Sequence, residues 1–278
     1  MPSFDTTGPI SATVEIDIAS VRITASKRTD AVVEVLPADG ADERDVWCAQ
    51  QTKVSYSAGK LLVKGPKKRS LFGKVGSVDV SIELPAGSEV QGTVALGDFS
   101  CEGPLGDCRL KTSAGDLQVA EAAAANLRTA HGDVSLGLAT GDVEVSGGGR
   151  VELGRLLGTA TVKNSNGETS IREVTGDLVA KASNGRISIG SAQAGVEVKT
   201  ANGAIRIGEV VRGVVQLNTA MGDVEVGIRE STAAWLDVNT RLGTVRNSLG
   251  PTEGPDTAER TVELRARTGL GDIVISRA

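Results

Sequence analysis

The chain has 278 residues, a formal net charge of −5 and 35 glycines, but aromatic residues make up only 2% of it. The slight acidic excess argues against a general nucleic-acid-binding protein, which usually carries a strongly basic domain. So few aromatic residues also argue against a globular β-sandwich of this size, whereas a repeat protein can fill each thin layer with Val, Ile, Leu and Thr.

The first hundred residues predict short strands and one helix. Apolar and polar residues alternate with the period of half-buried strands in six segments: Thr13–Ile18, Val21–Ala25, Val32–Leu36, Lys53–Tyr56, Leu61–Lys64 and Val78–Leu84. Residues Asp42–Gln50 fit a short helix. We expect residues 1–95 to form an irregular β cap with entry coils, because the end of a repeat stack needs atypical units.

From Gly115 onward, a turn made of a small residue or Asn followed by Gly recurs at a spacing near 18 residues. The clearest copies are Leu127–Leu136, Ala180–Ile189 and Val198–Ile207. The turn glycines are Gly115, Gly132, Gly149, Gly167, Gly185, Gly203 and Gly222, with looser copies at Gly243 and Gly271. A fixed period of this size indicates stacked supersecondary units. Asn166, Asn184 and Asn202 precede three of these glycines and could form an amide ladder along the stack.

Two topologies fit a strand, an Asn-Gly turn and a second strand. One is an antiparallel hairpin, and the other is a coil whose strands pair in parallel with the next repeat. A flat meander would leave its apolar face uncovered, since no helices are available to cover it. We therefore expect an all-β fold, a single right-handed parallel β-solenoid with coils of about 18 residues. Its regular part is predicted over residues 96–278, as one continuous domain with the cap.

No targeting or membrane segment is predicted. The first eight residues, Met1–Gly8, have neither a basic nor an apolar region, and no stretch approaches the ~18 apolar residues of a membrane helix. The cysteines Cys48, Cys101 and Cys108 are odd in number, which favours reduced thiols. A disulfide between Cys101 and Cys108, which flank a short turn, is the less favoured alternative. We therefore expect a cytoplasmic protein with no integral membrane segment.

The repeats follow the entry sequence Val78–Gly87 and are joined near the end by Ala233–Thr240. Over about residues 10–275, this combination resembles the toast-rack family of bacterial β-strand-repeat proteins. Members carry the labels putative adhesin and domain of unknown function. The resemblance implies a non-catalytic fold. Many relatives are membrane-tethered or face the envelope, and some look like envelope-stress sensors.

The turns contain possible metal ligands and the single histidine of the chain. Asp98, Asp116 and Asp133 follow glycine and should stack on adjacent coils, where carboxylates either bind a cation or repel each other. Turn formation is the favoured explanation over calcium, so no cofactor is expected. His131 occupies the slot of the turn asparagines, which predicts a residue tolerating positive φ and not a catalytic base.

Two basic features are candidate contact surfaces. The outward column before the turn contains Lys111, Arg128, Lys163, Lys181 and Lys199. Such a stripe either keeps an exposed sheet soluble or docks an acidic protein partner. The loop Lys64–Gly76 contains Lys67, Lys68, Arg69 and Phe72, which predicts contact with anionic lipid or protein, or simply a soluble loop.

The last repeat, Thr261–Ser276, is expected to end the stack with an open apolar cross-section. Its apolar residues are Val262, Leu264, Ile273 and Ile275. A cover should come from the Ser248–Glu259 loop, a second copy in a homodimer, or another partner. The sequence as a whole predicts a non-catalytic scaffold or protein-interaction module, in a bacterial stress or envelope-related process by resemblance. The alternative is a carbohydrate-active or calcium-binding β-helix.

Overall fold

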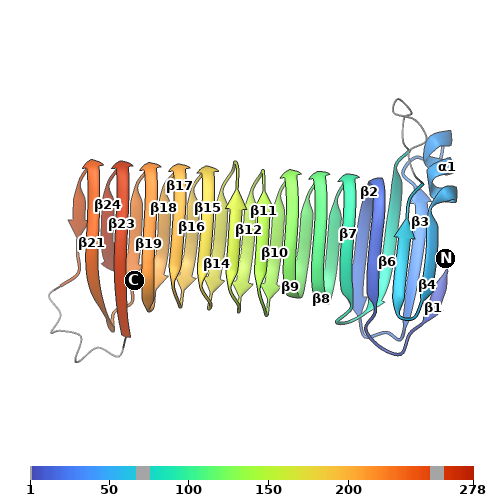
Figure 1. Cartoon of the computed structure of the whole chain (residues 1–278), viewed down its shortest axis with the longest axis horizontal. Helices are drawn as coiled ribbons and strands as arrows, with labels where there is room; N and C mark the ends of the chain where they lie inside the picture. The colour runs from blue at the N-terminus through green and yellow to red at the C-terminus, as the bar shows by residue number, and fades with distance from the viewer. Residues whose placement is uncertain (1, 67–75, 251–259) are drawn as a thin grey trace. The chain divides into compact units, whose positions relative to one another are not determined.

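A computed structural model describes residues 2–66, 76–250 and 260–278 (Figure 1). The chain divides into two compact units, Met1–Gly137 and Leu138–Ala278. Within the described residues, all regular elements are strands except α1 (Glu43–Gln51). No helix in this part of the chain has the length and apolar character needed to cross a bilayer. The all-β prediction is confirmed.

The first unit contains α1 and the strands that begin the coils. Their bounds are β1 (Ser3–Asp5), β2 (Ser11–Ser26), β3 (Asp30–Pro37), β4 (Lys53–Ser57), β5 (Lys60–Lys64), β6 (Val78–Pro85), β7 (Glu89–Leu96), β8 (Phe99–Ala114) and β9 (Leu117–His131). The division between the units falls within β10 (Val134–Ala139).

The second unit contains the regular repeats. Their strands are β11 (Val143–Gly147), β12 (Val151–Leu156), β13 (Ala160–Asn164), β14 (Thr169–Val174), β15 (Leu178–Asn184), β16 (Ile187–Ala192), β17 (Val196–Asn202), β18 (Ile205–Val210), β19 (Gly213–Met221), β20 (Val224–Ile228), β21 (Thr232–Leu242), β22 (Val245–Asn247), β23 (Arg260–Leu270) and β24 (Ile273–Arg277). Each coil contributes one strand before its turn and one after it.

Successive coils of the second unit pair in parallel, so that each strand lies beside the strand one repeat later. Ala160 of β13 lies opposite Leu178 of β15, which lies opposite Val196 of β17. The strands after the turn follow the same rule, with β14, β16 and β18 in register. Their inward side chains, such as Val162 and Val198, are almost completely buried. The β-solenoid prediction is confirmed, and antiparallel hairpins at these turns are excluded.

Inward threonines close the turns by hydrogen bonding to the neighbouring coil. Thr219 Oγ1 donates to the Gly203 carbonyl at 3.0 Å, and Thr268 Oγ1 donates to the Gly222 carbonyl at 2.8 Å. Both threonines are buried. Threonine therefore recurs in this column because its hydroxyl can satisfy a turn carbonyl of the neighbouring coil, although Thr200 makes no such bond.

The asparagines before the turns form the expected amide ladder. Asn184 Nδ2 donates to Asn166 Oδ1 at 3.1 Å, and Asn202 Nδ2 donates to Asn184 Oδ1 at 3.0 Å. The next residue, Gly185, has a φ of +120°. A Cβ atom there would lie 1.9 Å from the Gly167 carbonyl oxygen of the preceding coil. The close approach of coils at the turn therefore requires glycine, in addition to the backbone angle.

The order of the last two coils differs from their order in the sequence. β23 pairs with β19 on one side and with β21 on the other, and β24 lies in the same way between β20 and β22. Figure 1 shows β21 beyond β23. The prediction that Thr261–Ser276 ends the stack is wrong. The last coil consists of β21 and β22, which come earlier in the sequence, and this repeat lies between them and the coil of β19 and β20.

At the start of the first unit, β2 is one long strand that occupies both strand positions of a coil. Its first half pairs in parallel with β5 and β7, and its second half with β6 and β8. Beyond β5 and β6, the chain adds antiparallel strands, since β4 pairs with β5, β3 with β6 and β1 with β3. The two strands predicted over Thr13–Ala25 are thus one continuous strand.

The predicted helix is confirmed as α1. Asp42 caps its N-terminus by accepting a hydrogen bond from the Arg44 N–H at 2.8 Å, as N-cap residues commonly do. Asp45 Oδ1 accepts from the Ser77 N–H at 2.8 Å, which ties the helix to the residue before β6. The helix therefore belongs to the covering layer over the first coil.

The cysteines Cys48, Cys101 and Cys108 are buried and free. Cys101 and Cys108 do lie together, as their positions around the turn suggested. A hydrogen bond to Cys108 and burial both raise the pKa of Cys101. The pair therefore behaves as apolar core filling and not as exposed reactive thiols.

Candidate functional site

A row of outward-facing lysines crosses one sheet face of the second unit. Lys163 of β13, Lys181 of β15 and Lys199 of β17 lie opposite one another in the parallel registers of these strands. The row continues on β19, β23 and β21 with Asn218, Arg267 and Asn239. All three lysines are exposed, and a strand separation of about 4.8 Å sets their spacing. The structure thus brings three of the five stripe residues into one row.

The charges beside this row are unevenly balanced. Lys199 Nζ lies 2.7 Å from Glu197, and this hydrogen bond, with the charges of Lys199 and Lys181, lowers the pKa of Glu197. In the neighbouring strand β15, Val179 takes the position of Glu197. Among the described residues, no carboxylate forms an ion pair with Lys163 or Lys181. These two ammonium groups are therefore available to an acidic partner.

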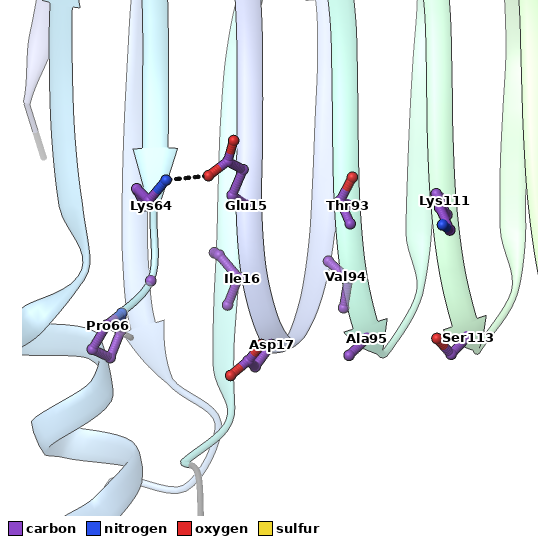
Figure 2. Close-up of a pocket in the computed structure, with 11 residues that line it drawn as sticks. Glu15, Ile16, Asp17, Lys64, Pro66, Thr93, Val94, Ala95, Lys111 and Ser113 are labelled. Carbon is purple, nitrogen blue, oxygen red and sulfur yellow. Dashed lines mark hydrogen bonds and ion pairs between the residues drawn. The ribbon is translucent and has the colours of Figure 1, made fainter. Parts of the chain in front are cut away.

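The other two stripe residues, Lys111 and Arg128, belong to the first unit and lie opposite each other on β8 and β9. Arg128 Nε donates to Asn126 Oδ1 at 2.9 Å. Lys111 lies opposite Thr93 of β7, at the edge of a surface groove (Figure 2). The predicted stripe is therefore a pair of cations in one unit and a row of three in the other.

The groove in Figure 2 has a volume of about 650 Å³ and contains charges of both signs. Lys64 Nζ forms an ion pair with Glu15 across β5 and β2. Asp17 also lines the groove, which thus contains two carboxylates, but none of the described lining residues is aromatic. Ligand sites usually combine apolar and aromatic walls with few polar groups. The groove therefore gives only limited support to the carbohydrate-active alternative.

The aspartates of the Gly-Asp turns bind the backbone of the next coil. Asp98 Oδ1 accepts from the Asp116 N–H at 2.7 Å, and Asp116 Oδ1 accepts from the Asp133 N–H at 2.8 Å. The same contact recurs in the second unit, where Asp223 Oδ1 accepts from the Asp272 N–H at 2.8 Å. In the part of the chain that the structure describes, no group of three His, Cys, Asp or Glu side chains is placed to hold a metal. The contacts favour a structural role.

His131 lies exposed at the end of β9, opposite Ala114. Among described residues other than glycine, only Ala58 has a positive φ. The prediction that His131 is chosen for a positive φ is therefore wrong. The strand runs on through this residue, and the following Gly132, with a φ of +141°, makes the turn.

The other two predicted contact surfaces are not exposed surfaces of the described structure. Lys67, Lys68, Arg69 and Phe72 lie outside the described residues. Val262, Leu264, Ile273 and Ile275 are buried inside the inserted coil of β23 and β24. They cannot meet a partner, because strands cover them on both sides.

Three apolar side chains lie exposed at one corner of the last coils, a feature the sequence analysis missed. Met221, Leu270 and Leu242 lie opposite one another on β19, β23 and β21, with exposed fractions of 54%, 46% and 66%. They take the position that Asn202 holds one coil earlier. The signal was in the sequence, since the residue before the turn glycine changes from Asn to Met or Leu. We call these three residues the apolar corner.

The coil of β21 and β22, here called the end coil, is paired on one side only within the described structure. Trp235 is 57% exposed. Leu236 and Val238 point inward but are only half-buried, whereas Leu264, opposite Leu236, is fully buried. Exposed apolar side chains thus occur both on the end coil and at the apolar corner, and clusters of such side chains commonly mark interaction sites.

Comparisons with known proteins give one family match and several similar solved structures. The model of the family described as Toastrack DUF4097 matches residues 12–275. No curated protein matches the chain. The chain is similar to the solved structure of a putative adhesin from Parabacteroides distasonis ATCC 8503, with 12% identity and a TM-score of 0.32 over 98% of this chain and 95% of that one. For a putative adhesin from Bacteroides fragilis NCTC 9343, the values are 14% identity and a TM-score of 0.37 over 99% and 95%.

Proposed function

The chain belongs to the Toastrack DUF4097 family, and from that premise we propose that it is a non-catalytic β-solenoid that docks an acidic protein partner. The observation that carries the proposal is the lysine row of the second unit. Lys163 and Lys181 stand on neighbouring strands, and neither forms an ion pair among the described residues. Cations at strand spacing on a sheet face complement carboxylates presented by an extended segment.

Charge reversal in the row tests this proposal. Lys163→Glu combined with Lys181→Glu should weaken binding of poly-L-glutamate by about tenfold or more, because each change turns an attraction into a repulsion. Lys53→Glu with Lys60→Glu, two exposed positions on β4 and β5, is the control with the same change in net charge. Calorimetry at two salt concentrations measures both. If the row variant and the control variant lost the same affinity for poly-L-glutamate, the row would serve only to keep the sheet soluble, and this result would contradict docking.

The competing function is a carbohydrate-active or calcium-binding β-helix, which the two carboxylates of the groove in Figure 2 favour. We expect calcium or a chelator to leave the melting temperature unchanged, because the turn aspartates already accept backbone hydrogen bonds. A ligand at about 100 times its dissociation constant adds roughly 2.7 kcal/mol. A calcium-dependent rise would therefore be visible and would point to Asp98, Asp116 and Asp133.

We also propose that the protein acts in the cytoplasm, in a bacterial stress or envelope-related process. The three buried free cysteines support a reducing compartment, where disulfides are rare. The process follows from the family resemblance. Recovery of the native protein in the envelope fraction would overturn the location. Normal growth of a deletion strain under envelope stress would count against the process.

A further inference from the structure

The end coil of the second unit supports an inference that does not depend on the lysine row. We propose that β21 and β22 form a two-fold interface with a second copy of this chain, in which β21 pairs antiparallel with β21 of the other copy. Among the described residues, no strand pairs with the outer edge of β21. An unpaired edge exposes backbone N–H and C=O groups and is a template for another strand.

The apolar interior of the end coil requires a cover. In the inserted coil, the inward residues Leu264 and Ala266 are fully buried. Their neighbours Leu236 and Val238 on β21 point the same way and stay half-buried. The surface that fits this open cross-section is another coil of the same width, since each coil of this chain is covered by its neighbour in that way.

Only the same end of a second copy offers such a coil. In the first unit, the outermost parallel strands β5 and β6 are already paired with the antiparallel strands β4 and β3. Stacking of the end coil on the first unit of another copy, which would produce filaments, is therefore blocked by these antiparallel strands. End coil against end coil remains, and this arrangement closes as a dimer.

The charged side chains of β21 favour one register of the two paired β21 strands over the others. Only registers that preserve the alternation keep Leu236 and Val238 facing inward. A two-fold axis at Asp237 would place two carboxylates opposite each other, which is unfavourable. Asp237 already forms an ion pair with Arg267 of its own chain at 3.0 Å. An axis at Asn239 places this carboxylate opposite a second cation, Arg241 of the other copy, and the pair occurs twice. Arg241 is exposed and forms no ion pair within the described chain.

The same register also covers apolar surface. It places Leu242, which is 66% exposed, opposite the half-buried Leu236 of the other copy. Leu242 is the outermost residue of the apolar corner. The interface therefore combines paired edges, two ion pairs and a covered apolar side chain, which are the components of a specific interface.

A charge-swap experiment tests the interface. We expect the wild-type protein to be a dimer in light scattering across the micromolar range. Arg241→Glu and Asp237→Lys should each raise the dimer dissociation constant at least tenfold, because each places like charges opposite each other twice. Mixing the two variants should restore a dimer containing one copy of each, detectable by native mass spectrometry. Arg186→Glu, an exposed position in the turn before β16, is the control and should remain dimeric.

Cross-linking tests the register. Asn239→Cys should form a disulfide between two copies under mild oxidation with diamide, since a residue on the axis faces itself within disulfide reach. The native cysteines are buried and should stay silent. Lys181→Cys, in the same outward row but inside the stack, should not cross-link.

Three results would overturn the proposal. The first is a wild-type monomer throughout the micromolar range, and the second is a dimer that Arg241→Glu leaves intact. The third is a monomer that dimerises only after residues 251–259 are replaced by a glycine-serine linker of equal length, which would assign the cover to the chain's own segment. Loss of poly-L-glutamate binding has no bearing here, so this test and that of the lysine row fail independently.

Discussion

The outermost coil of the first unit and that of the second differ in whether further described strands pair with them. In the first unit, the coil of β5 and β6 is followed by the antiparallel strands β4, β3 and β1, and α1 adds to this cover. In the second unit, the end coil of β21 and β22 has no further strand beyond it among the described residues.

The difference shows how one repeat pattern supports two kinds of edge. A switch from parallel to antiparallel strands ends the stack, because the added strands no longer offer a coil on which another coil could continue. At the end coil the parallel pattern stops without such a switch. Since unpaired edges and open apolar interiors are costly in water, we interpret the first edge as closed and the second as an interface.

Burying a charge at each edge should give the largest contrast. Val33 of β3 is fully buried in the covering layer, so Val33→Asp should destabilise the protein by about 3–5 kcal/mol. Leu236→Asp on the half-buried end coil should cost about 1 kcal/mol in the monomer. Urea denaturation at a concentration below dimerisation measures both. Similar losses would mean that the two edges are equally covered.

Valine at the turn glycines should give the next largest effect. A Cβ atom at Gly185 would lie 1.9 Å from the Gly167 carbonyl oxygen, and one at Gly243 would lie 2.0 Å from that of Gly271. Gly185→Val should cost about 3 kcal/mol, because coils on both sides hold the turn in place. Gly243→Val should cost about half as much, since the end coil can move outward. Thermal denaturation provides the comparison, and a larger loss for Gly243→Val would contradict it.

Lowering the pH should weaken the attachment of the end coil to its neighbour, and we expect this effect to be the smallest. The Thr244 N–H donates to Asp272 Oδ1 at 2.8 Å, and this bond lowers the pKa of Asp272 below its ordinary value of 3.8. Because the folded-state pKa is lowered, the stabilisation is complete above pH 3.8 and is lost as pH falls through the folded value. The fluorescence of Trp235, with Trp47→Phe removing the other tryptophan, should report the change. An unchanged acid transition in Asp272→Asn would contradict this contact's role.

The sequence predicted the repeat and its chemistry well, because each coil repeats the same local requirements. The strand alternation, the asparagine ladder and the turn glycines follow from contacts that neighbouring coils share. Register was less reliable where spacing varied. The basic column has a gap between Arg128 and Lys163, where Ser146 of β11 is the residue that lies opposite Lys163.

The order of the coils could not be predicted from the pattern. β21 and β23 carry the same columns, with Thr240 opposite Thr268 and Asn239 opposite Arg267. Either strand would therefore pack equally well against β19, and periodicity does not distinguish the two orders. The one sign was the long connection between the repeats, Ser248–Glu259, which is more than a turn needs. The end coil, and with it the candidate interface, was missed for this reason.

Hydrogen exchange tests the coil order and the open edge most directly. In dilute protein below the dimerisation range, we expect the amides of Arg260–Leu270 to exchange slowly and those of Thr232–Leu242 to exchange faster, although the first segment is nearer the chain end. This follows because β23 is paired on both sides and β21 on only one side within the described structure. Fastest exchange in Arg260–Leu270, or equal protection of both segments in the monomer, would contradict this account.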